Sequence, residues 1–283
     1  MIKVLSAGIF STIQDFGRVG FQKYGVPYSG VMDQKAASFA NAILGNKKDL
    51  PVLEITMQGP KLQFDRDTSI CISGADLSAK LNSHPVLNNK PVSIKEGDML
   101  SFGKLTKGFR AYLAVSGGFK TEQVMQSFSM YQGITAKSKL EKHDVLEIES
   151  QNEFRENKHA IIKVNDGYFN SKTIEVFKGP EFDALSDHQK EYLLNQEFTI
   201  SKDNNRMAYQ LNEMLENNLE PVITSLVLPG TVQLTPSGKL IVLMRDCQTT
   251  GGYPRVLQLR ESAINVLAQK FTGQMVSFGL DMY

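Results

Sequence analysis

The sequence predicts a mainly β protein with a few short helices, built as two tandem β-barrel domains related by internal duplication. Two observations lead to this fold class. Short runs of β-branched and aromatic residues recur between clusters of Gly, Asn, Asp and Pro, a spacing typical of barrels and sandwiches. Segments of the first half also match segments of the second half in the same order. The clearest strand-like runs are 69–73, 111–115, 173–177 and 240–244.

The internal repeat is carried by apolar positions more than by identical residues. The segment 51–76 matches 221–246 at one constant offset, and 97–103 matches 273–279 at a slightly larger offset. Such a pattern is expected when the same strands fill the same core in two related domains. Chance similarity between glycine-bounded strands is the alternative, and two matches in one order favour duplication.

The domain boundaries follow from this repeat. Residues 104–165 have no counterpart in the second half, and the polar stretch 149–159 is the best candidate linker. We therefore expect a first domain spanning 1–165 and a second domain spanning 166–283.

Helices are expected at only a few places. Residues 33–44 are predicted to be helical because Asp33 can cap the N-terminus, an apolar stripe follows, and Gly45 can end the helix. Residues 261–271 carry a second apolar stripe. Two further candidates are 184–194 and 206–215.

Composition narrows the class of protein. The 283 residues include 31 Lys and Arg against 30 Asp and Glu, which argues against binding to nucleic acid or to a membrane surface. No apolar run approaches the ~20 residues of a membrane helix, and the N-terminus resembles a first strand rather than a signal peptide. Cys71 and Cys247 both lie in apolar runs, which suits a reducing compartment. We expect a cytoplasmic protein.

The first set of candidate site residues follows an apolar strand in the second half. Two adjacent glycines there can adopt positive φ, and their N–H groups could form a nest for a carboxylate or phosphate. The alternative is a tight β-turn whose Thr hydroxyls satisfy its own backbone. Cys247 is a possible nucleophile, but a strand-end cysteine without a local His is more often inert. The candidates are Asp246, Gln248, Thr249, Thr250, Gly251, Gly252 and Tyr253.

A second set lies near the N-terminus. Asp15 precedes Arg18 by three residues, and Tyr24 and Tyr28 follow. A fixed arginine suits a planar carboxylate, and the tyrosines could line a polar pocket. The alternative is an Asp15–Arg18 pair that merely braces a loop. For Asp33, capping a helix is the expected role.

Several familiar signals are missing from the sequence. It has no phosphate-binding Gly-rich loop with Lys and Ser or Thr, and no dinucleotide motif after a strand. The four histidines, His84, His143, His159 and His188, do not have metal-ligand spacing. We therefore predict no metal site and no complete active site on this chain alone.

Taken together, the motifs resemble the biotin-dependent carboxyltransferase family. The resemblance covers nearly the whole chain, and its most specific motif is Gln-Thr-Thr-Gly-Gly-Tyr-Pro at 248–254. This family includes the C-type member of the ATP-dependent 5-oxoprolinase, the second subunit of allophanate hydrolase and the KIP antagonist. The other matching segments are 11–18, 24–33, 40–46, 53–56, 59–60, 112–118 and 229–233.

The resemblance implies two cyclophilin-like β-barrels and a heteromeric complex. The expected direct partner is a B-type subunit with a related barrel, and an A-type subunit is the third member. The complex would hydrolyse 5-oxo-L-proline to L-glutamate with ATP, and ATP is expected at a shared or partner site. The chain has no biotin-accepting Lys flanked by methionines, so any biotin would be carried elsewhere.

Roles for individual residues follow from this interpretation. Asp15, Arg18 and Asp246 are the expected catalytic residues, with the arginine as a donor and the two acids orienting groups or handling a proton. The expected substrate contacts are Tyr28, Gln248, Thr249, Thr250, Gly251, Gly252 and Tyr253.

The chain departs from the family pattern at four places. Residues 126–130 take the place of the family's Gly-Ser-x-Ser-Thr, and Ala136-Lys137 takes the place of Gly-Arg. Residues 205–211 occupy the position of Asp-Arg-Met-Gly-Tyr-Arg-Leu, and Cys247 replaces an arginine. Two alternatives to a 5-oxoprolinase function therefore stay open. One is a carboxyltransferase that acts on a urea-like substrate through a separate biotin carrier. The other is a non-catalytic protein that sequesters a kinase inhibitor resembling the B-type partner.

Overall fold

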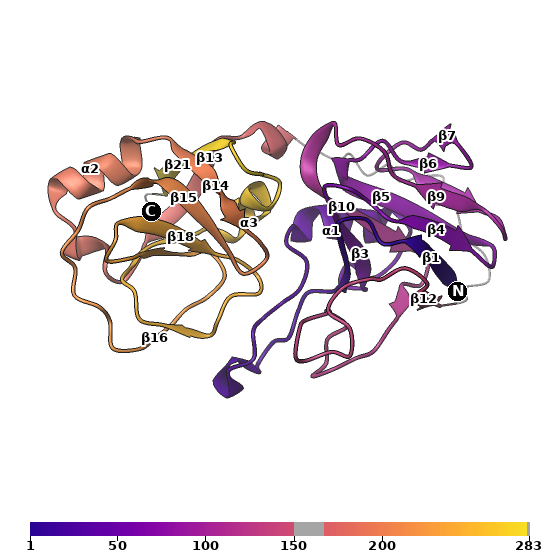
Figure 1. The fold of residues 1–283 in the computed structure, drawn as a ribbon, viewed down its shortest axis with the longest axis horizontal. Coiled ribbons are helices and arrows are strands. Elements are labelled where there is room, and N and C mark those ends of the chain that lie inside the picture. Colours follow the sequence, from indigo (N-terminus) through magenta and orange to yellow (C-terminus); the bar gives the residue numbers. More distant parts are fainter. Residues whose placement is uncertain (150–166, 282–283) are drawn as a thin grey trace. The chain divides into compact units, whose positions relative to one another are not determined.

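The computed structural model describes residues 1–149 and 167–281. It divides into two compact units (Figure 1). The first unit contains Met1–Gly17 and Ser29–Asp166, and the second contains Arg18–Tyr28 and Gly167–Tyr283. The predicted boundary at 165/166 and almost all of the predicted linker 149–159 lie outside the described residues. The predicted mainly β class is confirmed, and the described residues contain three α-helices.

The first unit consists of two sheets that share one apolar core. Buried residues of both sheets, among them Ile2, Leu62, Leu53 and Leu113, belong to a single core cluster. In sheet order, the seven-stranded sheet is β11 (Phe119–Lys120), β12 (Val145–Ile148), β1 (Ile2–Ser6), β4 (Lys61–Phe64), β9 (Met99–Ser101), β6 (Lys80–Leu81) and β7 (His84–Pro85). The five-stranded sheet is β2 (Phe10–Gln14), β3 (Val52–Thr56), β10 (Lys107–Val115), β5 (Thr68–Asp76) and β8 (Pro91–Ile94).

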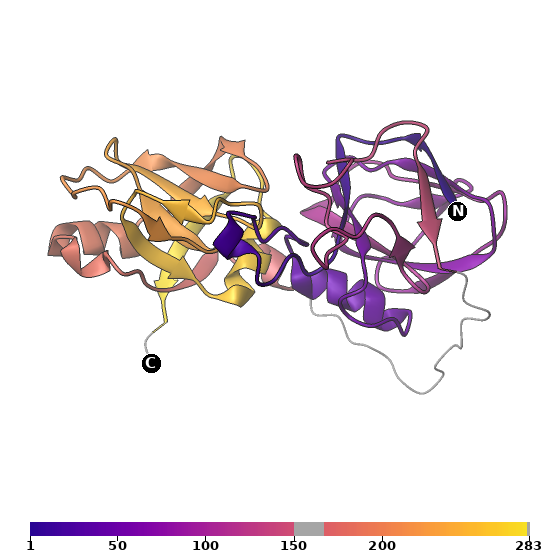
Figure 2. The ribbon, with the colours of Figure 1, turned by 90° about the horizontal axis from the view of Figure 1, so that it is seen from below.

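The helix predicted over 33–44 is confirmed as α1 (Gln34–Ile43). The Asp33 side chain caps it by accepting a hydrogen bond of 3.0 Å from the Ala36 N–H. Its alanine face packs against β5 and β10, and Figure 2 shows the helix lying along the first unit. Gly45 follows with a φ of 72°, as expected for a residue that ends a helix.

The second unit is a closed seven-stranded barrel. All neighbouring strands are antiparallel except β13 and β21, which are parallel. Around the barrel the order is β13 (Thr173–Lys178), β20 (Arg255–Leu259), β17 (Thr231–Leu234), β18 (Lys239–Leu243), β15 (Ala208–Met214), β14 (Phe198–Asn204) and β21 (Met275–Leu280). The other elements of this unit are α2 (Asp187–Asn195), α3 (Glu261–Ala268), the two-stranded sheet of β16 (Ser225–Leu226) and β19 (Thr250–Gly251), and the short 3₁₀ helices η1 (Gln22–Tyr24), η2 (Gly167–Asn170) and η3 (Phe182–Ala184).

Two of the remaining helix predictions are confirmed and one is wrong. The helices α2 and α3 form close to the predicted places, and Ser186 and Gln189 make a capping box at the start of α2. The segment 206–215, predicted to be helical, contains strand β15 instead. Tyr209 and Leu211 are buried while the residues around them are more exposed, so the period is two and not 3.6.

The internal repeat is visible in the positions of the strands. The matched segments form β4 and β17, β5 and β18, and β9 and β21. Their neighbours differ, however, because β17 pairs directly with β18 whereas β4 and β5 belong to different sheets. Duplication is thus reflected in where strands occur and not in how they pair. No helix within the described ranges is long and apolar enough to cross a membrane.

Candidate functional site

The polar segment 246–253 connects β18 and β20 of the barrel. Its residues Thr250 and Gly251 form β19, which pairs with β16 in a ribbon outside the barrel. Two more backbone hydrogen bonds extend this ribbon: the Val222 N–H donates to the Gly252 carbonyl at 3.0 Å, and the Val227 N–H donates to the Thr249 carbonyl at 3.1 Å. We call residues 222–227 with 249–252 the ribbon.

The ribbon differs from both structures that the sequence suggested for this segment. Gly251 and Gly252 are not among the residues with positive φ, so the nest predicted from them does not form. The Thr249 and Gly252 carbonyls are satisfied by the facing strand and not by a tight turn. The predicted substrate contacts Gln248, Thr249, Thr250, Gly251, Gly252 and Tyr253 therefore lie on or beside an extended strand, with Thr250, Gly252 and Tyr253 exposed.

One arginine fastens the ribbon to the barrel. Arg255 on β20 forms a bidentate pair with Glu181, with Nε–Oε2 and Nη2–Oε1 distances of 3.0 and 2.8 Å. Its Nη1 donates to the Leu226 carbonyl of β16 at 3.0 Å. These hydrogen bonds hold the pKa of Glu181 below its usual value. A single guanidinium thus ties together η3, β20 and the ribbon.

A buried glutamine lies beneath the ribbon. Gln233 on β17 is 2% exposed, and a Cβ added to Gly251 would lie 2.5 Å from its Nε2. The residue forms part of the segment 229–233 noted above, yet the sequence did not mark it as a site residue. The signal was the alternation along β17, where Thr231 and Gln233 interrupt the apolar Val232 and Leu234.

Asp246 lies next to the ribbon and is bound to an arginine. Its Oδ2 and Oδ1 accept hydrogen bonds from Arg206 Nε and Nη2 at 2.8 and 2.9 Å. The Asp246 N–H also donates to the Arg206 carbonyl at 2.9 Å. Burial raises the pKa of the neighbouring Cys247 thiol to about 12, so this cysteine is protonated near neutral pH, as expected for an inert thiol.

Asp15 acts as the hub of a hydrogen-bond network in the first unit. Its Oδ1 accepts from Ser127 Oγ and Ser129 Oγ, both at 2.6 Å, and from the Gly17 N–H at 2.8 Å. Its Oδ2 accepts from the Phe128 N–H at 2.7 Å. Together these hydrogen bonds bind the loop 127–129 to Asp15.

Arg18 and Tyr28 belong to the second unit. The Arg18 N–H donates to the Tyr28 carbonyl at 2.7 Å, which closes the loop that contains η1. The Arg18 side chain is fully buried, and Tyr28 is half-buried. The structure therefore brings these two predicted residues together through their backbones.

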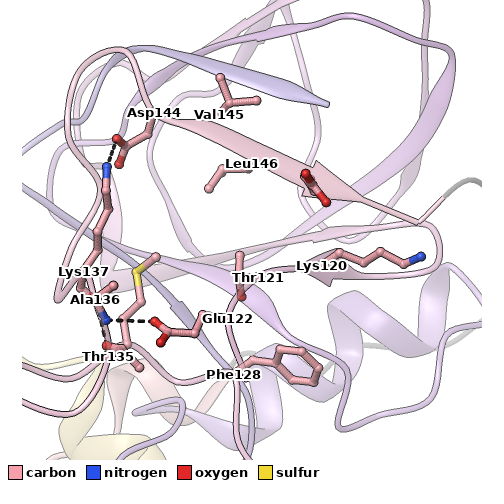
Figure 3. Close-up of a pocket in the computed structure, with 12 residues that line it drawn as sticks. Lys120, Thr121, Glu122, Phe128, Thr135, Ala136, Lys137, Asp144, Val145 and Leu146 are labelled. Carbon is pink, nitrogen blue, oxygen red and sulfur yellow. Dashed lines mark hydrogen bonds and ion pairs between the residues drawn. The ribbon is translucent and has the colours of Figure 1, made fainter. Parts of the chain in front are cut away.

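A cavity of about 520 Å³ lies in the first unit (Figure 3). Its walls carry the ion pair between Lys137 and Asp144 and a hydrogen bond of 2.8 Å from the Ala136 N–H to Glu122 Oε2. The other lining residues are Lys120, Thr121, Phe128, Met130, Thr135, Val145, Leu146 and Glu147. None of the predicted site residues lines it, although Asp15 holds the backbone of Phe128.

The described residues contain no group of three or more His, Cys, Asp and Glu side chains placed to hold a metal ion.

Comparison with known proteins decides the family. The family model described as "Carboxyltransferase domain, subdomain A and B" matches residues 24–280. The chain belongs to this carboxyltransferase family.

The relatives of this carboxyltransferase domain fall into two groups. The chain is 32% identical over 285 residues to the 5-oxoprolinase C subunit of Escherichia coli, and 30% identical over 286 residues to that of Haemophilus influenzae. Each match covers 98% of this chain and 90% of the relative. The chain is also 43% identical over 130 residues to the urea amidolyase of Lachancea kluyveri, which is 46% of this chain and 7% of that protein.

Solved structures confirm the fold of the carboxyltransferase domain. TTHA0988 matches with a TM-score of 0.88 at 24% identity, over 98% of this chain and 56% of that chain. The Kluyveromyces lactis urea carboxylase matches with a TM-score of 0.84 at 26% identity, over 98% of this chain and 27% of that chain. The domain thus spans about half of the first protein and about a quarter of the second.

In this carboxyltransferase domain, one departure from the family pattern keeps a positive charge. Lys137, at the position of the family's arginine, is a cation on the cavity wall bound to Asp144. Arg206 matches the arginine of the family pattern in the segment 205–211, and it binds Asp246. Cys247, at the position of another arginine, contributes a neutral buried thiol.

Proposed function

We propose that this carboxyltransferase domain is the C-type member of an ATP-dependent 5-oxoprolinase that works with partners of the A and B types. The proposal is carried by the identity of 30–32% along 98% of the chain to the C-type proteins of two 5-oxoprolinases, of which it covers 90%. A match of that extent leaves little of either relative without a counterpart.

The chemistry requires stabilisation of a developing negative charge. A lactam is a resonance-stabilised amide, and its hydrolysis breaks the ring C–N bond, with water supplying the hydroxyl of the new carboxylic acid and a proton for the amine. ATP, bound at a shared or partner site and hydrolysed to ADP and phosphate, supplies the activation. The charge forms on the carbonyl oxygen, so donors aimed at that oxygen lower the barrier.

The proposed donors come from the residues predicted at the site. They are Arg18, Gln248, the Thr249 and Thr250 hydroxyls and the Gly251 and Gly252 N–H groups, while Tyr28 and Tyr253 would contact the rest of the substrate. We assign Asp15 and Asp246 positioning roles, because the oxygens of both already accept hydrogen bonds from the protein.

Reconstitution tests this proposal. The chain is co-expressed with A- and B-type partners, and L-glutamate release from 5-oxo-L-proline is measured with and without ATP. We expect release that depends on ATP and on all three chains. Failure to release glutamate from a complex that still contains the B-type partner would reject the proposal.

A second candidate function is favoured by one observation. The identity to urea amidolyase reaches 43%, although over only 46% of this chain. This supports a carboxyl-transfer role on urea or a similar amide, with the biotin carrier on another polypeptide. Carboxylation of urea by the chain together with a carboxylated carrier would favour it, and glutamate release would count against it.

A further inference from the structure

One buried amide lacks a hydrogen-bond partner. The Nε2 atom of Gln233 is buried and has no acceptor within residues 1–149 and 167–281. A donor that gives up water on folding without gaining an acceptor destabilises the native state, so folded proteins rarely retain one. The position of this amide directly beneath the ribbon suggests that it is retained for binding.

The neighbours of Gln233 do not offer the missing acceptor. In the strand register it lies between Ile241 on β18 and Arg255 on β20. Ile241 is apolar, and the Arg255 guanidinium is itself a donor that is already bound to Glu181 and to the Leu226 carbonyl. Neither of these two side chains therefore supplies an acceptor to the Gln233 amide.

Gly251 keeps the space above the amide open. With any other residue at this position, the Cβ would approach Gln233 Nε2 to 2.5 Å, and glycine alone avoids that overlap. The backbone of residue 251 therefore lies close to the amide, with the Val227 side chain beside it. The hydroxyl-bearing Thr249 and Thr250 directly precede this position.

The ribbon is held by few contacts. It lies outside the barrel, β16 and β19 have two residues each, and Leu226 is 70% exposed. Such a segment, in which Val227 is the one buried apolar side chain, opens locally at low free-energy cost. A small ligand can therefore reach Gln233 without unfolding the barrel.

We propose that Gln233 Nε2 donates a hydrogen bond to the amide carbonyl oxygen of the substrate, bound between the ribbon and β17. In this respect the inference rests on the proposed function, because the carbonyl of 5-oxoproline belongs to a lactam. Urea presents the same carbonyl, so the site also fits the second candidate function. Gln233 thereby joins the ribbon residues in orienting the bond that is broken.

Thermal stability provides the first test. Replacing Gln233 with the similarly sized, apolar Met removes an unsatisfied donor, so the melting temperature of the full chain without ligand should rise. Gln258→Met is the matched control: this glutamine of the adjacent strand β20 accepts from Thr231 Oγ1 at 2.8 Å and donates to the Pro229 carbonyl at 2.9 Å, so its loss should lower the melting temperature. A similar decrease for Gln233→Met would overturn the proposal, because it would mean that the amide is satisfied within the fold.

Ligand binding provides the second test, made on the assembled complex. The Gln233→Met variant should bind 5-oxo-L-proline roughly tenfold more weakly, the effect of one lost hydrogen bond to a buried group. Its affinity for L-proline, which lacks the ring carbonyl oxygen, should not change. An equal loss for both ligands, or no loss for either, would contradict the proposed contact.

Urea separates this inference from the proposed function. If the wild-type complex does not bind 5-oxo-L-proline but binds urea in a manner weakened by Gln233→Met, the 5-oxoprolinase proposal fails and the carbonyl site stands. If binding of neither amide depends on Gln233, the inference fails whatever the activity of the complex.

Discussion

At the scale of single residues, the two predicted catalytic acids both accept several hydrogen bonds from the protein. Asp15 accepts four hydrogen bonds from the protein, and Asp246 is held in a bidentate pair by Arg206. Gly17 is close to Asp15 in the sequence, but the other three hydrogen-bond donors, in the loop 127–129, lie more than a hundred positions away. No local pattern could have identified them, because the contacts depend on how the loop 127–129 folds back on β2.

Removing the Asp15 carboxylate should destabilise the first unit strongly. In Asp15→Ala, Ser127, Ser129 and the Phe128 N–H lose their acceptor, and we expect a loss of about 3 kcal/mol in the free energy of unfolding. Urea denaturation of the full chain measures this change. The control is Asp67→Ala. Like Asp15, Asp67 accepts hydrogen bonds, in its case from a lysine and a backbone N–H, but it lies on the surface. Equal, small effects of the two substitutions would show that the Asp15 network contributes little.

At the scale of elements, the ribbon is the part of the structure that the sequence did not predict. The strand positions and the helix capped by Asp33 were predictable, because capping, period and turn signals are local. The segment 206–215 was misassigned as a helix, since its apolar residues fit either period. The glycines at 251 and 252 were expected to bend the chain, whereas Gly251 is required for close contact with Gln233. That contact depends on a strand distant in sequence.

The anchor of the ribbon should make stability depend on pH in the acid range. Because Arg255 lowers the pKa of Glu181, the pair stabilises the fold above the unfolded-state value of roughly 4.3. This contribution is lost as the pH falls through the lower folded-state pKa. We expect the melting temperature of Glu181→Gln to be lower than wild type at pH 7 and to approach it below roughly pH 4. A constant difference at all pH values would contradict the assignment.

The chain passes close to the backbone of β20 at Gly179, directly after β13. A Cβ on Gly179 would lie 2.1 Å from the Arg255 carbonyl oxygen, and backbone cannot swing aside as a side chain can. We expect Gly179→Ala to lower the free energy of unfolding by about 3 kcal/mol. Gly252→Ala is the control, because its nearest atom, the Val222 carbonyl oxygen, lies 3.2 Å away. Both are measured by denaturant titration, and equal losses would argue against this contact.

At the scale of the whole molecule, the two units do not coincide with the two halves of the sequence. Arg18–Tyr28 lies in the first half of the chain but belongs to the second compact unit. The internal repeat indicated two domains and could not reveal this exchange, because periodicity reports on strands and not on which core a loop joins. The candidate site residues are accordingly distributed over both units, as Asp15 and the set around Arg18, Tyr28 and Asp246 show.

A fragment that begins at residue 167 should be less stable than the same unit in the full chain. It lacks Arg18–Tyr28, and with it the buried Arg18. We expect calorimetry to show its transition several degrees below that of the second unit in the full chain, since a loss of 1 kcal/mol shifts the melting temperature by about 2–8 °C in units of this size range. A synthetic peptide spanning 18–28 should restore part of the difference. An unchanged transition would mean that the segment contributes nothing to this unit.

The exchange of residues 18–28 between the units also constrains how such a gene can change. A single crossover near the midpoint would join residues 18–28 of one parent to residues 167–283 of the other, although both segments belong to the same unit. Recombination with a homologous gene is therefore tolerated only where both donors agree on that short stretch. Inheritance should accordingly preserve the two halves as one block, even if each began as a copy of the other.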